Sequence, residues 1–410
     1  MKAVVFTLGC KVNSCESSSI MNGLESLGYE VSDKLEFADI YIINTCAVTG
    51  EAEKKSRQAV ARVKKFNPFA KIFVLGCASQ NNPNAFINKE GVEVVMGTAS
   101  KDKILKLLDK KGCFIEEPTS YYEEYLPIKV TKSRSYVKIQ DGCNNFCSYC
   151  LIPYLRGRIR SRSVESIKRE IDYLQPEEVV LTGINLSAYN YNGIDLAELL
   201  NLLKDCKCRI RLGSLEVNVV DERFLNACKN LFDFAPHFHL SLQSGSDKVL
   251  REMNRHYTKE EYLKKVELIR SYFPLAGITT DVICGFSTET IEDFEESYET
   301  CKKAEFSDIH CFTYSKREGT KAFLLKELSP AVKQERLEKM LELKQKLKVN
   351  FLNKLIGKEL SFLPESFKNG YTEGYTENYV RVYVKGKVSN QITKIKIIEI
   401  FNDGCLAVEI

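Results

Sequence analysis

The stretch Gln140-Asp-Gly-Cys143-Asn-Asn-Phe-Cys147-Ser-Tyr-Cys150 places three cysteines at C-x3-C-x2-C spacing, directly after the strand-like run 135–140. Three thiolates can hold three corners of a [4Fe–4S] cube and leave the fourth iron open. An open iron of this kind can bind S-adenosylmethionine, and an electron from the cube can then split the sulfonium to give a 5′-deoxyadenosyl radical. A structural zinc site would need a fourth protein ligand, and no histidine lies near these cysteines. The spacing therefore favours an iron–sulfur cluster over zinc.

This loop resembles the cluster loop of the radical S-adenosylmethionine superfamily, which has the same spacing and an aromatic residue before the last cysteine, as Tyr149 is here. The resemblance implies that Cys143, Cys147 and Cys150, the loop trio, are the ligands of a catalytic [4Fe–4S] cluster. It also implies that S-adenosylmethionine is a cofactor and that Tyr149 lies beside it.

The composition is typical of a soluble globular chain of 410 residues, long enough for two to four domains. Hydrophobic residues make up 44% and charged residues 28%, and the formal net charge of +4 is too small to indicate a polyanion partner by itself. The chain begins in a strand-like run without the pattern of a leader, and no apolar run reaches the length of a membrane span. We therefore expect a cytoplasmic protein without membrane contact, whose 15 cysteines are reduced and include metal ligands.

Residues 1–116 are expected to form an α/β domain with a parallel sheet, because short β-rich runs alternate with helical patterns. The expected strands are at 2–7, 40–45, 71–76 and 92–96, and the expected helices are at 14–27, 50–65, 80–89 and 101–111. In open sheets of this kind, ligands bind at the carboxyl ends of the strands.

Three cysteines follow those strands, one in each βα unit: Cys10, Cys46 and Cys77, the N-terminal trio. A single such cysteine is most often a small buried residue that closes a strand. Three in equivalent positions favour a second cluster at one edge of the sheet. Cys15 lies one helical turn further on, and we expect it to be an ordinary helical residue.

With both trios in this order, the chain resembles the methylthiotransferases of the radical S-adenosylmethionine superfamily over essentially its whole length. The resemblance implies three domains. Residues 1–116 would carry a second [4Fe–4S] cluster on the N-terminal trio, residues 130–345 would form a partial (βα)6 barrel with a linker helix, and residues 352–410 would form a small all-β, RNA-binding barrel called TRAM.

The central part alternates strand and helix again, and counting the strand before the loop trio gives six βα units, as in an open barrel. The expected strands are at 135–140, 179–183, 209–214, 237–242, 278–283 and 309–314. The expected helices are at 164–174, 195–205, 247–253, 259–272 and 290–303.

Polar residues at the strand ends are candidates for cosubstrate binding, although each of them would also suit a helix cap or a turn. Gly183 would let the backbone approach the methionine end of the cosubstrate, and Glu216 and Gln243 would hydrogen-bond its polar groups. The resemblance places cosubstrate contacts at these strand ends, which include Asn185. It also matches Arg255 to a motif arginine that suits a carboxylate.

Four arginines alternate with other residues in the segment 155–162, and Lys132, Arg134 and Lys138 precede the loop trio. A basic run beside a reactive centre suits a nucleic-acid phosphate backbone. The alternative is a solvated strand edge, which shows the same period of two. The run favours nucleic-acid contact.

A long amphipathic helix at 330–350 is expected to pack across the barrel. The β-rich alternation that follows is typical of a small barrel, with expected strands at 359–363, 379–384, 394–400 and 406–410. We expect Tyr371, Tyr375 and Tyr379 to be exposed there, where they would stack on splayed bases.

The resemblance implies a sulfur insertion and methylation at an unreactive C–H bond. One S-adenosylmethionine would give the radical at the loop trio, and a second would donate a methyl group to sulfur carried at the N-terminal trio. The radical would remove hydrogen from C2 of an adenine, which then receives the methylthio group; an external electron donor and a sulfur source are also implied. The motif Gly9-Cys-Lys-Val-Asn13 resembles the branch that modifies N6-threonylcarbamoyladenosine in the anticodon stem-loop of tRNA.

Two sister branches remain as alternatives. One modifies N6-isopentenyladenosine in tRNA and usually shows Gly-Cys-Gln-Met-Asn, and the other modifies a ribosomal-protein aspartate and usually shows Gly-Cys-Pro-Lys-Asn. Two other classes of protein also stay open. A non-catalytic RNA-binding metalloprotein would not need two cysteine trios, and a radical enzyme acting on a small molecule would not need an RNA-binding barrel.

Overall fold

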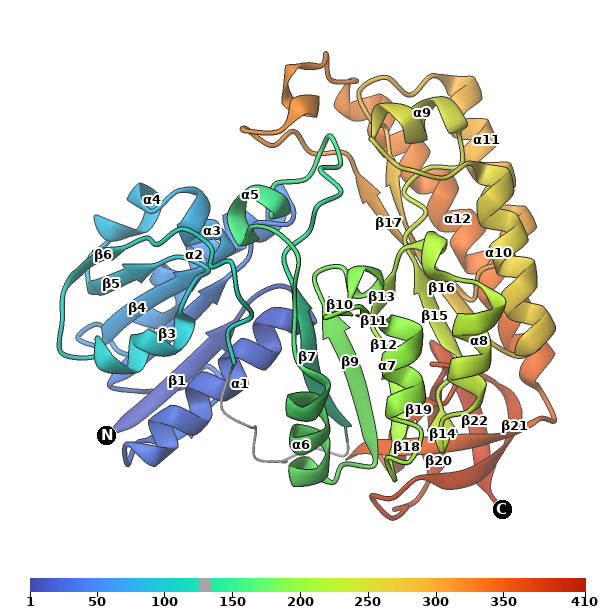
Figure 1. The fold of residues 1–410 in the computed structure, drawn as a ribbon, viewed down its shortest axis with the longest axis horizontal. Coiled ribbons are helices and arrows are strands. Elements are labelled where there is room, and N and C mark those ends of the chain that lie inside the picture. The colour runs from blue at the N-terminus through green and yellow to red at the C-terminus, as the bar shows by residue number, and fades with distance from the viewer. Residues whose placement is uncertain (125–133) are drawn as a thin grey trace.

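A parallel sheet forms the N-terminal part of the structure, a computed structural model that describes residues 1–124 and 134–410 (Figure 1, blue to cyan). Its strands are β1 Lys2–Thr7, β2 Glu30–Ser32, β3 Ile40–Thr45, β4 Lys71–Gly76, β5 Val92–Met96 and β6 Gly112–Phe114. They pair in the order β2-β1-β3-β4-β5-β6, and every neighbouring pair is parallel, which confirms the expected α/β class. The helices are α1 Lys11–Ser26, α2 Gly50–Lys64, α3 Cys77–Asn81 and α4 Asn84–Ile87.

Two of the expected helices in this part are wrong. The expected helix at 80–89 is interrupted at Asn82, whose φ of −146° and ψ of 84° are not helical. The ring of Pro83 explains this, because it disfavours the helical conformation in the preceding residue. The segment 101–111 forms only the 3-10 turn η1, Lys101–Lys106. The expected domain start at residue 130, and Lys132, lie outside the described residues.

Six parallel strands form the open barrel of the central part (Figure 1, green to orange). They are β7 Arg134–Asp141, β9 Glu178–Gly183, β12 Arg209–Leu212, β15 His237–Leu240, β16 Gly277–Cys284 and β17 Asp308–Thr313. They pair in chain order within two sheets, β7-β9-β12 and β15-β16-β17. The short strand β13 Ser214–Leu215 joins the two sheets, since it follows β12 in the chain and pairs with β15. This confirms the six-stranded barrel predicted from the sequence.

The remaining elements of this part lie between those strands. The helices are α5 Ile152–Arg156, α6 Val164–Leu174, α7 Leu196–Leu202, α8 Glu222–Lys229, α9 Asp247–Glu252, α10 Lys259–Tyr272 and α11 Ile291–Ala304. Shorter elements are β8 Arg160–Ser161, β10 Asn190–Tyr191, β11 Ile194–Asp195, β14 Asp233–Phe234 and the 3-10 turns η2 Leu186–Ala188, η3 Val217–Val219 and η4 Lys321–Leu324.

The long helix α12, Pro330–Leu355, connects the central barrel with a closed C-terminal barrel (Figure 1, red). Met340 and Leu343 pack in the core of the central barrel, and Phe351 and Leu355 pack in the core of the second one. The second barrel has the strand order β18-β19-β20-β22-β21, with β18 Glu359–Lys368, β19 Tyr371–Thr376, β20 Arg381–Lys385, β21 Thr393–Phe401 and β22 Gly404–Glu409. Within the described part of the chain, no helix is both long enough and apolar enough to cross a bilayer.

A network of buried charges joins the N-terminal sheet to the central barrel. The buried carboxylate of Glu16, on α1, pairs with Lys101 at 2.5 Å, with Lys138 of β7 at 2.9 Å and with Arg156 of α5 at 2.8 Å. Lys138 and Arg156 also pair with Asp141, at 2.7 and 3.2 Å. Burial alone would raise the pKa of Glu16, but the charges of Arg156, Lys101 and Lys138 hold it well below its ordinary value. Glu16 is therefore an ionised carboxylate at the centre of three cations.

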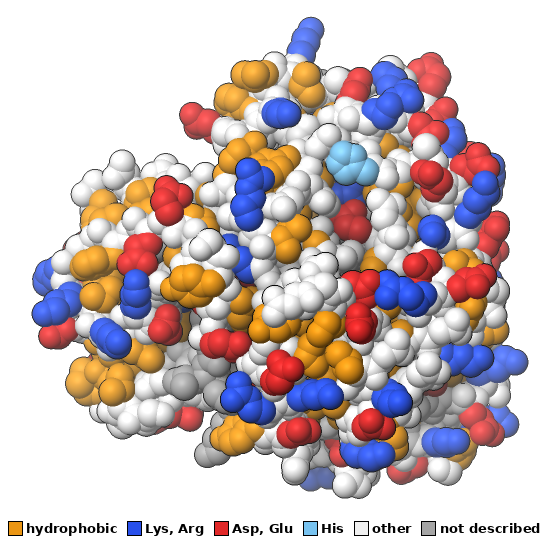
Figure 2. Space-filling view, in the orientation of Figure 1, with side chains coloured by type: hydrophobic (Ala, Val, Ile, Leu, Met, Phe, Trp, Pro, Cys, Tyr) orange, Lys and Arg blue, Asp and Glu red, His pale blue; other side chains and the backbone are white. Residues whose placement is uncertain are grey.

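The prediction that the arginines after the loop trio form a phosphate-binding surface is wrong for three of the four. Arg156, Arg160 and Arg162 are buried in ion pairs with carboxylates, whereas Arg158 is exposed. Figure 2 shows Lys and Arg side chains intermingled with Asp and Glu over this face of the molecule, without a patch of one sign.

Replacing Glu16 with glutamine removes the shared partner of three buried cations. We expect Glu16→Gln to lower the free energy of unfolding by about 3–5 kcal/mol. The control Glu30→Gln removes a surface partner of Lys2, with a Glu30 side chain that is 74% exposed, and should cost less than about 1 kcal/mol. Denaturant unfolding of both variants measures the difference, and equal stability of the two would contradict the role of the network.

Candidate functional site

The N-terminal trio lies at one edge of the first sheet, as the sequence predicts. Cys10 follows β1, Cys46 follows β3 and Cys77 opens α3 directly after β4. These three strands are neighbours in the sheet, so their carboxyl ends are adjacent. Burial, with smaller contributions from the neighbouring Cys77 and Cys10, raises the pKa of the Cys46 thiol to about 11. Cys15, by contrast, points its thiol at the backbone oxygen of Tyr136, at 3.5 Å.

Glycine before two of these cysteines makes the close approach possible. Gly9 has φ +101°, and a Cβ there would lie 2.6 Å from Cys46 Cβ. Gly76 has φ +113°, and its Cβ would lie 2.5 Å from the Thr45 carbonyl oxygen. Both positions therefore require glycine. Ser56 of α2 fixes Cys46, because its hydroxyl donates to Cys46 O and accepts from Cys46 N, each at 3.0 Å.

The loop trio lies between β7 and α5, where neighbouring segments hold the loop. The Ser148 N–H donates to Met253 O at 3.0 Å, and Ser148 O accepts from Ala322 N at 2.7 Å. Asn254 Nδ2 donates to Asn145 O at 2.8 Å. The loop is thus positioned by the segments that follow α9 and β17.

The sulfurs of the loop trio accept hydrogen bonds that suit thiolates. Cys143 Sγ accepts from Asn185 Nδ2 at 3.8 Å, and Cys147 Sγ accepts from Arg255 Nη1 at 3.3 Å. Burial raises the pKa of Cys143 and raises that of Cys150 to about 12, so a bound metal would be needed to hold these thiols ionised. No cysteine among the described residues is in a disulfide. Three free thiols without a fourth protein ligand fit a [4Fe–4S] cluster with one open iron.

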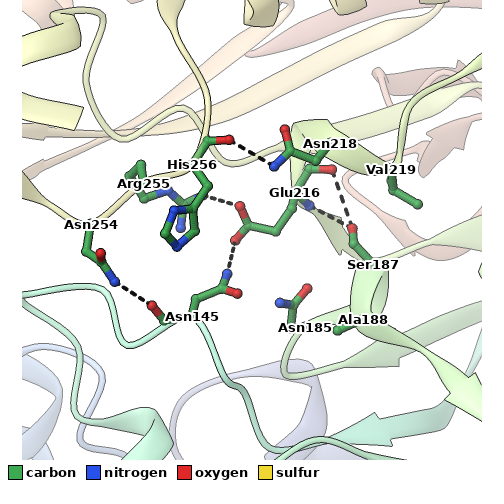
Figure 3. A pocket seen from close by; sticks show the side chains of 10 residues that line it. All are labelled: Asn145, Asn185, Ser187, Ala188, Glu216, Asn218, Val219, Asn254, Arg255 and His256. Carbon is green, nitrogen blue, oxygen red and sulfur yellow. Dashed lines mark hydrogen bonds and ion pairs between the residues drawn. The ribbon is translucent and has the colours of Figure 1, made fainter. Parts of the chain in front are cut away.

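A cavity of about 280 Å³ lies beside the loop trio, and polar side chains converge on it (Figure 3). Arg255 is buried and forms an ion pair with Glu216, whose other oxygen accepts from Asn145 Nδ2 at 3.2 Å. Asn185 Oδ1 is buried without a hydrogen-bond partner in the described structure. A guanidinium, a carboxylate and amide groups in one small cavity suit the ammonium and carboxylate of an amino acid. Three predicted cosubstrate contacts, Asn185, Glu216 and Arg255, are therefore brought together.

The other three predicted cosubstrate contacts do not line this cavity. Tyr149 packs against an apolar cluster beneath the loop. A Cβ at Gly183 would lie 2.9 Å from the Gln140 side chain, so packing against that residue already accounts for the glycine. The backbone of Gln243 pairs with β16 and has a φ of 68°. The cavity is also lined by seven residues that were not predicted from the sequence, and two of them, Asn254 and His256, flank Arg255 in the chain. The other five are Asn145, Ser187, Ala188, Asn218 and Val219.

A second cavity, of about 690 Å³, runs through the interior of the central barrel. It is lined by Gly183 at the carboxyl end of β9 and by His237 and Asp308 at the amino ends of β15 and β17. Cys10 lines it from the N-terminal sheet, and Tyr379 lines it from the C-terminal barrel. All three parts of the chain therefore meet at this cavity.

Three of the chain's four histidines line the larger cavity. His239 Nε2 and His310 Nδ1 contact the two oxygens of Asp281 at 3.1 and 3.2 Å. Burial would raise the pKa of Asp281, but these hydrogen bonds and charges hold it well below its ordinary value. The ligand atoms of His239, Asp281 and His310 lie within 4.8 Å of one another, a spacing that would also suit a divalent metal.

The expected exposure of Tyr371, Tyr375 and Tyr379 is wrong, because all three are half-buried. Tyr375 stacks on Tyr379 with 4.7 Å between ring centroids, and Tyr379 stacks on His237 at 4.6 Å. Tyr371 packs on Phe401 at 5.5 Å. Tyr375 and Tyr379 therefore form part of the wall of the larger cavity.

Comparison with known proteins gives two family matches and several relatives that span most of the chain. The radical SAM superfamily matches residues 137–301, and an uncharacterized family, UPF0004, matches residues 2–97. A threonylcarbamoyladenosine tRNA methylthiotransferase, MtaB, of Aquifex aeolicus is 39% identical over 88% of this chain and 92% of its own length. The protein of that name from Bacillus subtilis is 35% identical over 89% and 85%. A tRNA-2-methylthio-N(6)-dimethylallyladenosine synthase of Thermoanaerobacter sp. is 36% identical over 88% and 81%.

Among solved structures, the radical S-adenosylmethionine methyltransferase TsrM from Kitasatospora setae is similar with a TM-score of 0.56 at 13% identity, covering 79% of this chain and 74% of that chain. Such a likeness shows the fold. The partial parallel barrel with its three-cysteine loop defines a radical S-adenosylmethionine enzyme. The relatives also identify the family within that superfamily. The chain belongs to the tRNA methylthiotransferase family. Its cofactors are accordingly S-adenosylmethionine and [4Fe–4S] clusters.

Adding a methyl group at Gly9 tests the close packing of the N-terminal trio. Gly28 is a matched control, because its φ of +84° is also left-handed but nothing lies within 4 Å of an added Cβ. We expect Gly28→Ala to cost about 1 kcal/mol for its backbone conformation, and Gly9→Ala to cost about 1–3 kcal/mol more through its clash with Cys46. Denaturant unfolding compares them, and equal losses would contradict this packing.

Proposed function

We propose that the chain inserts a methylthio group at C2 of N6-threonylcarbamoyladenosine in the anticodon stem-loop of tRNA. The observation that carries the proposal is a cavity beside each cysteine trio: Cys10 lines the larger one, and Asn185 and Arg255 of the smaller one hydrogen-bond the sulfurs of Cys143 and Cys147. The chain is also similar over most of its length to relatives named for this nucleoside. The partners would be tRNA, S-adenosylmethionine, an external electron donor and a sulfur source, and the reaction would take place in the cytoplasm.

In this proposal the N-terminal trio holds one cluster and the loop trio holds the other. Bound there with S-adenosylmethionine, the clusters would supply the 5′-deoxyadenosyl radical and the methylthio group. Arg255 and Glu216 pair with each other in the structure. With S-adenosylmethionine bound, Arg255 would bind the carboxylate of the methionine moiety and Glu216 would bind its ammonium group. Asn185 would use its unpartnered Oδ1 to accept a hydrogen bond from the ammonium.

The carboxyl end of β9 lies between the two cavities in the chain, since Gly183 lines the larger cavity and Asn185, two residues further on, lines the smaller one. The adenine would be held near the carboxyl end of β9, between the trios. We also propose that the chain divides into domains at 1–116, 130–345 and 352–410, and that the last of these contacts the tRNA.

Methylthiolation of N6-dimethylallyladenosine is the second candidate. The relative of that name from Thermoanaerobacter sp. is 36% identical over 88% of this chain, which is close to the similarity of the threonylcarbamoyladenosine enzymes. The two substrates differ in the N6 substituent, which carries a carboxylate and a hydroxyl in one case and is a hydrocarbon in the other.

Turnover of synthetic anticodon stem-loops tests the choice between these substrates. Anaerobically reconstituted protein is given S-adenosylmethionine, a reductant, sulfide and a stem-loop bearing either nucleoside, and the digested RNA is examined by mass spectrometry. We expect the methylthio product from the threonylcarbamoyl stem-loop and none when alanine replaces any member of either trio. Product from the dimethylallyl stem-loop alone would contradict the proposal.

Arg255→Ala should weaken binding of S-adenosylmethionine about ten- to a hundredfold, because it removes a buried charge-assisted hydrogen bond of roughly 1.5–3 kcal/mol. Arg251→Ala, which removes an exposed arginine of the neighbouring helix α9, is the control and should leave binding unchanged. Equilibrium dialysis with cluster-loaded protein measures both. Unchanged binding by Arg255→Ala would exclude this arginine from the cosubstrate site.

A further inference from the structure

We propose that the larger cavity receives the threonylcarbamoyl arm of the substrate adenosine and that the Lys11 ammonium binds the carboxylate of that arm. The inference rests on the proposed function and names the residue that would select its substrate. It is carried by the position of Lys11, by the charges around it and by the other groups that line the cavity.

Lys11 reaches the barrel interior from beside the N-terminal trio. It is the first residue of α1 and directly follows Cys10, and both residues line the larger cavity. Its side chain is half-buried. Among the described residues, none of the ion pairs within 4.0 Å includes Lys11. The cavity thus contains an ammonium group without a carboxylate partner from the described chain.

Two arginines lie near Lys11, outside the lining of the cavity, and add positive charge behind this wall. The guanidinium groups of Arg134 and Arg211 lie close enough to Lys11 to interact with its charge. Both arginines pair with Glu178, and Arg134 also pairs with Glu365 at 2.7 Å. Three cations therefore face two carboxylates, and both carboxylates are already engaged by the arginines. An anionic group of the substrate would balance the remaining charge.

The rest of the cavity suits the neutral groups of the arm. Besides its carboxylate, a threonylcarbamoyl group carries a ureido group and a hydroxyl, and the hydroxyls of Thr182 and Ser214 line the cavity. The carboxylates that line it are all paired: Asp281 with histidines, Asp308 with a lysine and Asp403 with an arginine. A volume of about 690 Å³ is sufficient for a nucleobase with such an arm. A hydrocarbon substituent would leave the ammonium without a partner.

A lysine beside a cluster ligand has a simpler alternative role, in which it only balances the charge of the cluster. That role would affect every substrate alike, whereas binding of a carboxylate affects only a substrate that carries one. The threonylcarbamoyl stem-loop and its methyl ester differ only at the carboxylate, which the ester replaces with a neutral and slightly larger group, and comparing them in wild-type and variant protein separates the two roles.

Equilibrium binding of these two stem-loops to full-length, cluster-loaded protein, followed by fluorescence anisotropy, is the test. We expect wild-type protein to bind the acid about tenfold or more tightly than the ester. Lys11→Gln, compared at equal iron content, should lose this factor for the acid and keep its affinity for the ester. Lys348→Gln is the matched control, because Lys348 also lines this cavity without an ion pair among the described residues, but it comes from α12 rather than from beside the N-terminal trio. It should keep the preference.

Three results would overturn the inference: equal affinity of the wild type for acid and ester, an equal loss for both in Lys11→Gln, or the same selective loss in Lys348→Gln. Turnover separates this inference from the proposed function. Wild-type protein that does not methylthiolate the threonylcarbamoyl stem-loop would overturn the proposed function. Wild-type protein that does so without a preference for the acid would overturn only the role of Lys11.

Discussion

The arrangement of the two cysteine trios depends on the buried ion pair between Glu16 and Arg156. Arg156 also pairs with the aspartate that precedes the loop trio, and its Nη2 donates to Asn13 Oδ1 at 2.7 Å. Asn13 Nδ2 in turn donates to the carbonyls of Leu8 and Thr45, at 2.8 and 3.0 Å, in the loops that carry the N-terminal trio. One guanidinium therefore links the segments that carry both trios. Buried charges of this kind contribute little net stability, but removing one partner is costly, so they fix geometry.

Each of the three parts of the chain contributes residues to the lining of the larger cavity. The central barrel is open at one side, and the start of α1 covers the interior there, with Cys10 in the wall of the larger cavity. The C-terminal barrel closes the amino ends of the strands through Tyr379, and α12 joins the cores of both barrels. The reacting groups would thus lie inside the molecule, where a radical is protected from solvent.

The features that the sequence predicted are local in the chain, and those it missed depend on distant partners. Strand and helix alternation, with a cysteine after each strand, was sufficient for the sheet, the six-stranded barrel and the place of both trios. Arg156 looked like part of a basic surface because its partner Glu16 lies 140 residues away, and nothing near it in the chain indicates burial. The burial of Tyr379 was missed for the same reason, since its stacking partner His237 comes from another part of the chain. The helix interrupted at Pro83 is different, because the proline was a local signal.

The central claim is that both trios hold clusters and that the two clusters lie close to each other. Electron paramagnetic resonance of protein with both clusters reduced tests it most directly, with two reference variants in which alanine replaces one whole trio. The account predicts that the wild-type spectrum shows spin–spin coupling between two clusters and so differs from the sum of the two reference spectra. A wild-type spectrum equal to that sum, or the spectrum of a single cluster, would contradict it.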